Sequence, residues 1–171
     1  MAVSEDRIDE LFEQMLANAD EEGWCHIPEG VTDEENKELS RRITIMTMQD
    51  RIDGLNEGIE KVMKYMRDVK KHLDEYDTMD QIKIKGGLET IKEDSQTILI
   101  DLHSDDKIGD FFRIGLVSYE DSESTENMEN ARKEMEELIV TEFKESLEKI
   151  KNSCTEMISK ADEIIGKLDI K

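Results

Sequence analysis

Residues 52–76 read IDGLNEGIEKVMKYMRDVKKHLDEY, and the spacing of their apolar side chains decides the expected fold. These side chains recur in alternating steps of three and four, which is the spacing of a coiled-coil seam. The same spacing extends upstream, giving ten consecutive positions from Ile45 to Tyr76. We call this stripe the seam and expect it to contact another helix. The seam residues assigned to that contact are Ile45, Met48, Ile52, Leu55, Ile59, Val62, Met66 and Val69.

The helix that carries the seam has a clear start. In the sequence TDEE, Thr32 and Glu35 are spaced as a capping box, in which each side chain bonds the backbone N–H of the other residue. Nothing interrupts the helical pattern before DEYDT, so a helix is predicted over residues 33–76. At 1.5 Å per residue it would be roughly 65 Å long.

Two further helices are predicted after a turn. Thr78 and Gln81 form a second candidate capping box, which predicts a helix over residues 79–103. Another helix is predicted over residues 126–168, although the apolar residues Met128, Ala131, Met135 and Leu138 lie on a frame offset from the rest of its stripe. Residues 104–125 between these helices read as a crossover loop laid on the bundle, or alternatively as a docking segment for a partner.

The N-terminal region predicts a separate, shorter helix. Ser4 can cap a helix that runs to about Ala19, with acidic residues in its first turn. A loop follows, marked by Gly23, Pro28 and Gly30, and it holds the single tryptophan, Trp24.

The expected fold is therefore all-α: an elongated three-helix antiparallel bundle or coiled coil with an additional short N-terminal helix. Residues 1–31 would form an acidic helix and a Trp-containing loop, and residues 32–171 the long bundle. Because the middle helix of the bundle is shorter than its neighbours, parts of the two long helices would pair with each other, take the N-terminal helix or face a second chain.

Composition narrows the class of partner. The chain carries 44 acidic and 23 basic residues, for a formal charge of −21, and it has no clustered basic face for phosphates or anionic lipids. No apolar run approaches the length of a membrane span, and the start lacks a signal-peptide pattern. We expect a cytoplasmic protein without direct nucleic-acid or membrane binding, in which Cys25 and Cys154 are reduced.

The negative charge is concentrated near the N-terminus. Residues 1–38 hold thirteen acidic residues against two basic ones. A dense acidic surface is attracted to the clefts that nucleic acids occupy on other proteins. The residues assigned to this surface are Glu5, Asp6, Asp9, Glu10, Glu13, Asp20, Glu21 and Glu22.

The sequence predicts no catalytic, cofactor or metal site. Di-iron bundles use Glu-x-x-His pairs, whereas Gly23, Val69 and Ile100 stand three residues before the three histidines. Cys25 and His26 are adjacent, without the spacing that zinc ligands usually have. No nucleophile, phosphate-loop or dinucleotide-binding motif is present.

The favoured function is a non-enzymatic helical scaffold, adaptor or complex subunit that acts through coiled-coil contact with itself or another protein. Trp24, Phe111 and Phe112 would be aromatic anchors of such an interface, or would pack within the chain. The alternative is an acidic nucleic-acid mimic, viral or bacterial, that blocks a basic nucleic-acid-binding protein. A chaperone-like or secretion-related helical binder shares the same sequence features.

Overall fold

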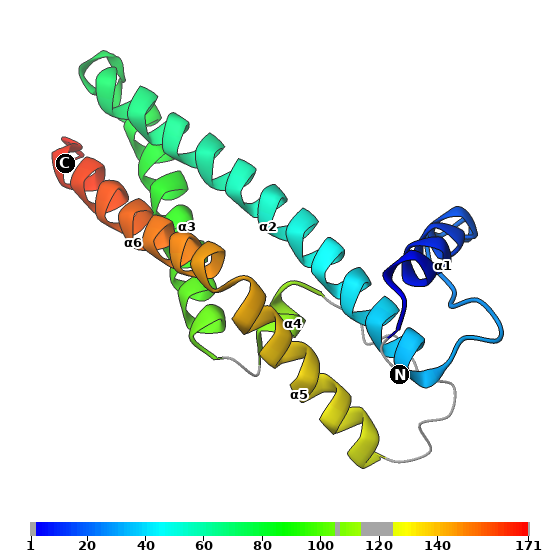
Figure 1. The fold of residues 1–171 in the computed structure, drawn as a ribbon. Coiled ribbons are helices and arrows are strands. Elements are labelled where there is room, and N and C mark those ends of the chain that lie inside the picture. Colours follow the sequence, from blue (N-terminus) through cyan, green and yellow to red (C-terminus); the bar gives the residue numbers. More distant parts are fainter. Residues whose placement is uncertain (1–2, 105–106, 114–124, 171) are drawn as a thin grey trace.

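The computed structural model describes residues 3–104, 107–113 and 125–170, with the backbone alone for residues 125–128. The fold is an all-α helical bundle, as predicted, and the described residues contain no strand. Figure 1 shows an elongated molecule in which one helix, α2, runs along most of its length. The elements are α1 (Glu5–Ala17), α2 (Asp33–Lys71), the 3₁₀ turn η1 (Leu73–Glu75), α3 (Thr78–His103), α4 (Ile108–Phe111), α5 (Thr125–Glu142) and α6 (Lys144–Lys167).

The start of α2 forms the predicted capping box. Thr32 Oγ1 accepts a hydrogen bond from the Glu35 N–H at 3.2 Å, and Glu35 Oε2 accepts one from the Thr32 N–H at 2.9 Å. At the other end, Lys70 and Lys71 occupy the last turn, where positive charge complements the helix dipole. α2 ends at Lys71 and the chain forms the 3₁₀ turn η1, so the predicted helix over 33–76 is confirmed except for its last turn.

The turn into α3 is capped differently from the prediction. The cap is Asp77, whose Oδ1 accepts from the Asp80 N–H at 2.8 Å, so the box assigned to Thr78 and Gln81 is wrong. Gln81 instead donates from Nε2 to the Tyr76 carbonyl and accepts from the Asp169 N–H, both at 3.1 Å. The same side chain therefore ties the α2–α3 turn to the chain's C-terminal end.

Residues 48–71 of α2 pack with α3 and α6 into what we call the closed end. In Figure 1, α3 runs antiparallel to both of the other helices, and its most extensive packing is against α6. Apolar side chains from all three helices fill the interior. The residues buried here include Ile52, Met66, Leu88, Ile150, Cys154 and Ala161.

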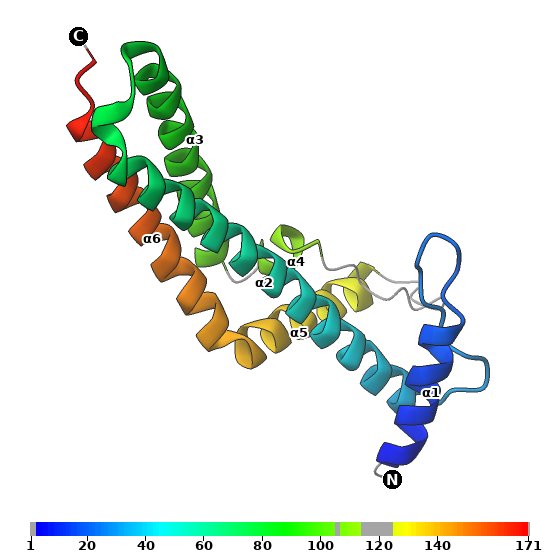
Figure 2. The ribbon, with the colours of Figure 1, turned by 90° about the horizontal axis from the view of Figure 1, so that it is seen from above.

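The predicted unbroken helix over 126–168 is wrong, because the chain bends at Phe143 between α5 and α6. Backbone hydrogen bonds continue through the bend, from the Phe143 N–H to the Ile139 carbonyl at 3.0 Å and from the Leu147 N–H to the Phe143 carbonyl at 2.9 Å. Phe143 is buried in the main core, which fixes the bend. Figure 2 shows α5 leaving the line of α6 at a clear angle.

We call α1, residues 33–47 of α2, and α5 together the open end. Here α1 covers one side of α2 through a small apolar core of its own, made by Ile8, Leu11 and Leu39. The predicted N-terminal helix, expected from Ser4 to about Ala19, is therefore present with slightly tighter bounds. α5 approaches the other side of α2, and the short helix α4 lies between the end of α3 and α5.

The crossover between α3 and α5 contains one ordered element. The short helix α4 is bound to α5, since the Glu136 carboxylate accepts from the Gly109 N–H at 2.9 and 3.0 Å and Arg132 pairs with Asp110. The loop predicted over 104–125 thus includes a helix. The rest of that predicted loop, residues 105–106 and 114–124, lies outside the described residues.

Candidate functional site

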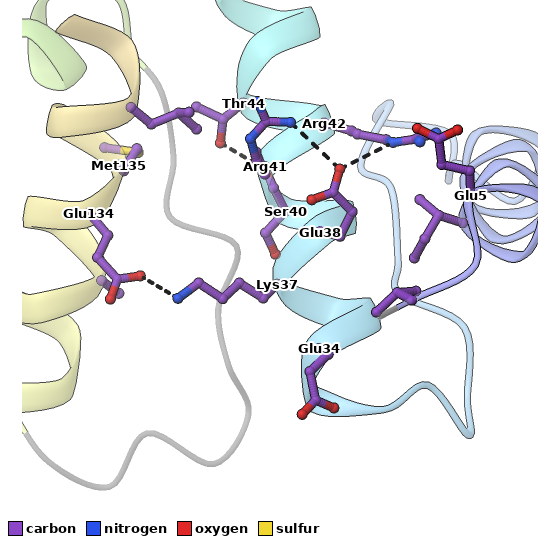
Figure 3. Close-up of a pocket in the computed structure, with 14 residues that line it drawn as sticks. Glu5, Glu34, Lys37, Glu38, Ser40, Arg41, Arg42, Thr44, Glu134 and Met135 are labelled. Atoms are coloured by element: carbon purple, nitrogen blue, oxygen red, sulfur yellow. Dashed lines mark hydrogen bonds and ion pairs between the residues drawn. The ribbon is translucent and has the colours of Figure 1, made fainter. Parts of the chain in front are cut away.

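The feature of the open end that several helices build together is a groove of about 630 Å³ between α1, α2 and α5. Figure 3 shows α2 in the middle, with α5 on one side and α1 on the other. The groove is lined by Val3, Glu5, Ile8, Glu34, Lys37, Glu38, Ser40, Arg41, Arg42, Thr44, Ala131, Glu134, Met135 and Leu138. Its volume falls within the roughly 300–1,000 Å³ typical of binding pockets.

Both walls of the groove contribute apolar surface. On α5, Ala131, Met135 and Leu138 stand at steps of four and three, so they share one face of the helix. All three are half-buried, which leaves part of each side chain accessible from the groove. On the opposite side, Val3 is half-buried, whereas Ile8 is only 1% exposed because it belongs to the small core under α1.

The cations of the groove already have carboxylate partners. Lys37 reaches across to Glu134 of α5 at 3.3 Å, and Arg41 binds Glu142 of α5 at 3.0 Å. Arg42 pairs with Asp9 of α1, and this hydrogen bond is the main cause of the raised pKa of its guanidinium. Ion pairs therefore hold both flanking helices to α2.

The floor of the groove is polar near its centre. Thr44 Oγ1 donates to the Ser40 carbonyl at 2.9 Å, one turn earlier in α2. The Ser40 hydroxyl oxygen is buried and has no hydrogen-bond partner among the described residues. Both side chains are short, so they leave space at the floor of the groove between α1 and α5.

The seam residues lie mainly in the interior of this same chain. Met48, Ile52, Ile59, Met66 and Val69 are buried. The other five seam residues are half-buried and pack against the same core: Ile45, Leu55, Val62, Leu73 and Tyr76. Contact of the seam with a second chain stays a prediction, and it would require the bundle to open.

The three predicted aromatic anchors have different surroundings. Phe112 is 4% exposed, and Phe111 meets it edge to face with ring centres 4.8 Å apart, so both belong to the packing around α4. Trp24 is 65% exposed. It is the one predicted anchor whose ring is largely accessible.

The loop that presents Trp24 is organised by Asp20. The Asp20 carboxylate accepts from the Trp24 N–H at 2.9 Å, from the Glu22 N–H at 3.0 Å, and contacts His26 Nε2 at 3.0 Å. The bond from Trp24 is the largest cause of the lowered pKa of Asp20. Gly23 has φ +85°, a backbone conformation that residues other than glycine rarely adopt, and it forms the turn just before Trp24.

The predicted acidic surface is exposed in full: all eight assigned carboxylates lie at the surface. Asp9 is bound to Arg42, and Glu10 lies 3.9 Å from Arg7. Asp20 is bonded within its own loop, and the other five assigned carboxylates make no ion pair with a described residue. Attraction of this acidic surface to a basic partner stays a prediction.

Other candidate groups lie apart from the groove. Cys154 is buried in the closed end, where burial raises the pKa of its thiol. Among the described residues, no group of three or more His, Cys, Asp or Glu side chains is arranged to hold a metal ion. No described helix is long and apolar enough to cross a membrane.

Sequence reasoning did not identify the groove, although one signal of it was present. The offset frame of Ala131, Met135 and Leu138 is the apolar wall of α5. The sequence spacing alone suggests that Arg41 and Arg42 pair with Glu38 in the same helix, and they do lie 3.6 and 3.5 Å from its carboxylate. Their bonds to α5 and α1 could not be seen in the sequence.

The comparisons with known proteins give no relative. No protein-family model matches the sequence, and neither a curated protein nor a solved structure matches it.

Proposed function

We propose that this protein is a non-enzymatic adaptor or complex subunit that binds another protein at its open end and uses the closed end as a rigid frame. The observation that carries the proposal is the groove beside residues 34–44 of α2, which has an apolar wall on α5 and no described helix over it. Partly accessible apolar side chains at a concave site are typical of protein and ligand binding.

The distribution of packing supports binding at the groove more than along the seam. Seam residues such as Ile52 and Met66 are already buried in the closed end. A partner helix there would have to displace α3 or α6, losing apolar contacts before making new ones. At the open end, a partner would add contacts to Ala131, Met135 and Leu138 without removing any described helix.

Recovery of partners from the native cell tests this proposal. The tagged chain is compared with Ala131→Lys, which places a long charged side chain in the groove, and with Gln96→Lys, which adds the same charge on the exposed surface of α3. We expect at least one protein to lose most of its recovery with Ala131→Lys alone. Equal recovery of every protein by all three chains would contradict the proposal.

The acidic-mimic function is the second candidate, and the uneven charge along the chain favours it. α1 has five acidic residues against one basic, the loop over 18–32 has four against none, and α5 has six against two. By contrast, α2 has nine of each and α6 has five of each. The excess charge of the described helices thus gathers at the open end, where it would attract a basic protein.

Neutralising exposed carboxylates separates the two candidates. Glu13, Glu21 and Glu22 make no ion pair with a described residue, so the variant Glu13→Gln/Glu21→Gln/Glu22→Gln leaves the fold intact. If the protein is a mimic, this variant loses basic nucleic-acid-binding partners, and moderate salt releases them from the unmodified chain. A partner that enters the groove responds to Ala131→Lys instead.

A further inference from the structure

The groove has the dimensions of a site for one face of a helix. At the closed end the apolar faces of α2, α3 and α6 form one closed core, whereas at the open end α1 and α5 flank α2 and the groove between them leaves part of each helix accessible. The groove follows α2 from Glu34 to Thr44, which at 1.5 Å per residue is about 15 Å, or roughly three helical turns. A helix laid there would seat a few apolar side chains between the walls and leave its other face in solvent.

The apolar spacing of the groove suits a helical occupant. Ala131, Met135 and Leu138 form a stripe along α5, and the short side chains Ser40 and Thr44 stand one turn apart on α2. Side chains at steps of three and four on an incoming helix can fit between such rows. A helix in the groove would contact α1, α2 and α5 together.

Charge identifies the polar flanks of that helix. Lys37, Arg41 and Arg42 are all bound to carboxylates, so they offer little to an acidic ligand. Glu5 and Glu34 line the groove without an ion-pair partner among the described residues. With the carboxylates that bind the three cations included, six acidic groups surround three basic ones: Glu5, Glu34, Glu38, Glu134, Asp9 and Glu142.

The same charges disfavour a second copy of this chain as the occupant. Each copy carries a formal charge of −21, and both α1 and α5, which flank the groove, have an excess of acidic residues. Two open ends would therefore repel each other.

We propose that the groove between α1, α2 and α5 binds an amphipathic helix of a partner protein whose apolar face is flanked by lysine and arginine. This inference rests on the proposed function, because it names the class of partner that the open end takes. The apolar face supplies the contact with the α5 wall, and the basic flanks lie against Glu5 and Glu34.

Designed peptides test the inference directly. Three labelled peptides of about 18 residues, long enough to cover the groove, are titrated with the full chain by fluorescence anisotropy. One has leucines at steps of three and four with Lys and Arg flanks, the second has the same leucines with Glu flanks, and the third has the basic composition in an order that destroys the apolar face. We expect the first to bind at least about tenfold more tightly than either of the others.

Variants place the binding in the groove. Ala131→Lys should weaken the basic amphipathic peptide by about tenfold, whereas the matched Gln96→Lys should leave binding unchanged. The exposed pair Glu5→Gln/Glu34→Gln, which breaks no ion pair among the described residues, should weaken binding a few-fold at about 0.05 M salt and less at about 0.3 M. Circular dichroism of each variant confirms that the fold is unchanged.

Each alternative outcome overturns the inference in a recognisable way. Equal binding of the scrambled basic peptide would mean that charge alone attracts it, and preference for the acidic peptide would reverse the assigned partner. A dimer seen by sedimentation and abolished by Ala131→Lys would make a second copy the occupant. If no peptide binds but partner recovery from cells still depends on Ala131, the proposed function stands and a basic amphipathic helix is the wrong class of partner.

Discussion

The two ends of the molecule share α2 but are held together by different forces. At the closed end, side chains such as Leu88 and Ile150 are fully buried between three helices. At the open end, α1 rests on a core of three buried residues, and ion pairs from Arg41 and Arg42 hold α5 and α1 to α2. Apolar burial contributes far more stability than exposed ion pairs do. The closed end therefore provides most of the stability, while the open end leaves apolar side chains of α5 partly exposed.

The largest effect should come from truncating a core side chain at the closed end. Ile150→Ala removes a fully buried side chain of α6 and leaves a cavity, so the free energy of unfolding should fall by about 2–5 kcal/mol. Met79→Ala, on the exposed surface of α3, should change it by less than about 0.5 kcal/mol. Urea unfolding measures both. Similar small effects for the two variants would contradict the assignment of the stability to the core of the closed end.

A smaller effect is expected where α4 joins α5, between the two ends. A methyl group at Gly109 would lie 2.6 Å from Glu136 Oε1 and 2.7 Å from Met135 Cε, so Gly109→Ala must displace the buried carboxylate from the Gly109 N–H. We expect a loss of about 1–3 kcal/mol in the free energy of unfolding.

Gly86→Ala is the matched control for Gly109→Ala. Gly86 is inside α3 and an added methyl group meets nothing within 4 Å, so alanine should stabilise the helix by about 0.5–1 kcal/mol. The two glycine replacements should therefore shift the urea midpoint in opposite directions. A gain in stability with Gly109→Ala would show that the Glu136 contact does not hold α4 in place.

At the open end, loss of the α2 cap should have a local effect. Thr32→Ala removes the acceptor for the Glu35 N–H and should cost about 1 kcal/mol. Hydrogen exchange should show faster exchange in the first turn of α2, with α6 unchanged. Equal acceleration along the whole of α2 would mean that the two ends unfold as one unit and would weaken the comparison.

The smallest effect concerns an ion pair at the closed end and depends on pH. Hydrogen bonds from Lys167, and then from Lys70, lower the pKa of Glu163 from 4.5 to about 2. Because the folded-state pKa is depressed, the contribution is present above about pH 4.5 and is lost as the pH falls towards 2. The side chain is exposed, so salt screens the effect.

Glu163→Gln isolates this contribution. The urea midpoints of the variant and the unmodified chain should differ slightly at about pH 6.5 and converge at about pH 2. Both conditions lie away from the sequence pI of about 4.5, where a net charge near zero would promote association. A difference that persists unchanged at the lower pH would contradict the role assigned to the ionised carboxylate.

Periodic features of the sequence predicted most of the fold. The seam of α2 and the capping box at Thr32 are local patterns, and each has the structure that its spacing implies. The cap of α3 was misplaced by one residue because Asp77 and Thr78 are both good capping residues, and only the geometry of the turn selects Asp77.

The candidate site was less predictable because it depends on the angle between helices. The offset apolar frame of α5 indicated a change of face, but the sequence does not specify the bend at Phe143 or its direction. The bend decides which side chains of α5 face α2. Glu136 and Gly109, separated by 27 positions, likewise come together only through the path of the crossover.

The ion pairs across the groove make its width responsive to the surrounding solution. Lys37 and Arg41 link α2 to α5, and these links weaken as ions screen them, whereas the apolar interior around Ile150 does not depend on such screening. A rise in ionic strength should therefore loosen the helices flanking the groove while the closed end stays packed. The salt concentration around the protein would in this way affect how far α5 can move away from α2.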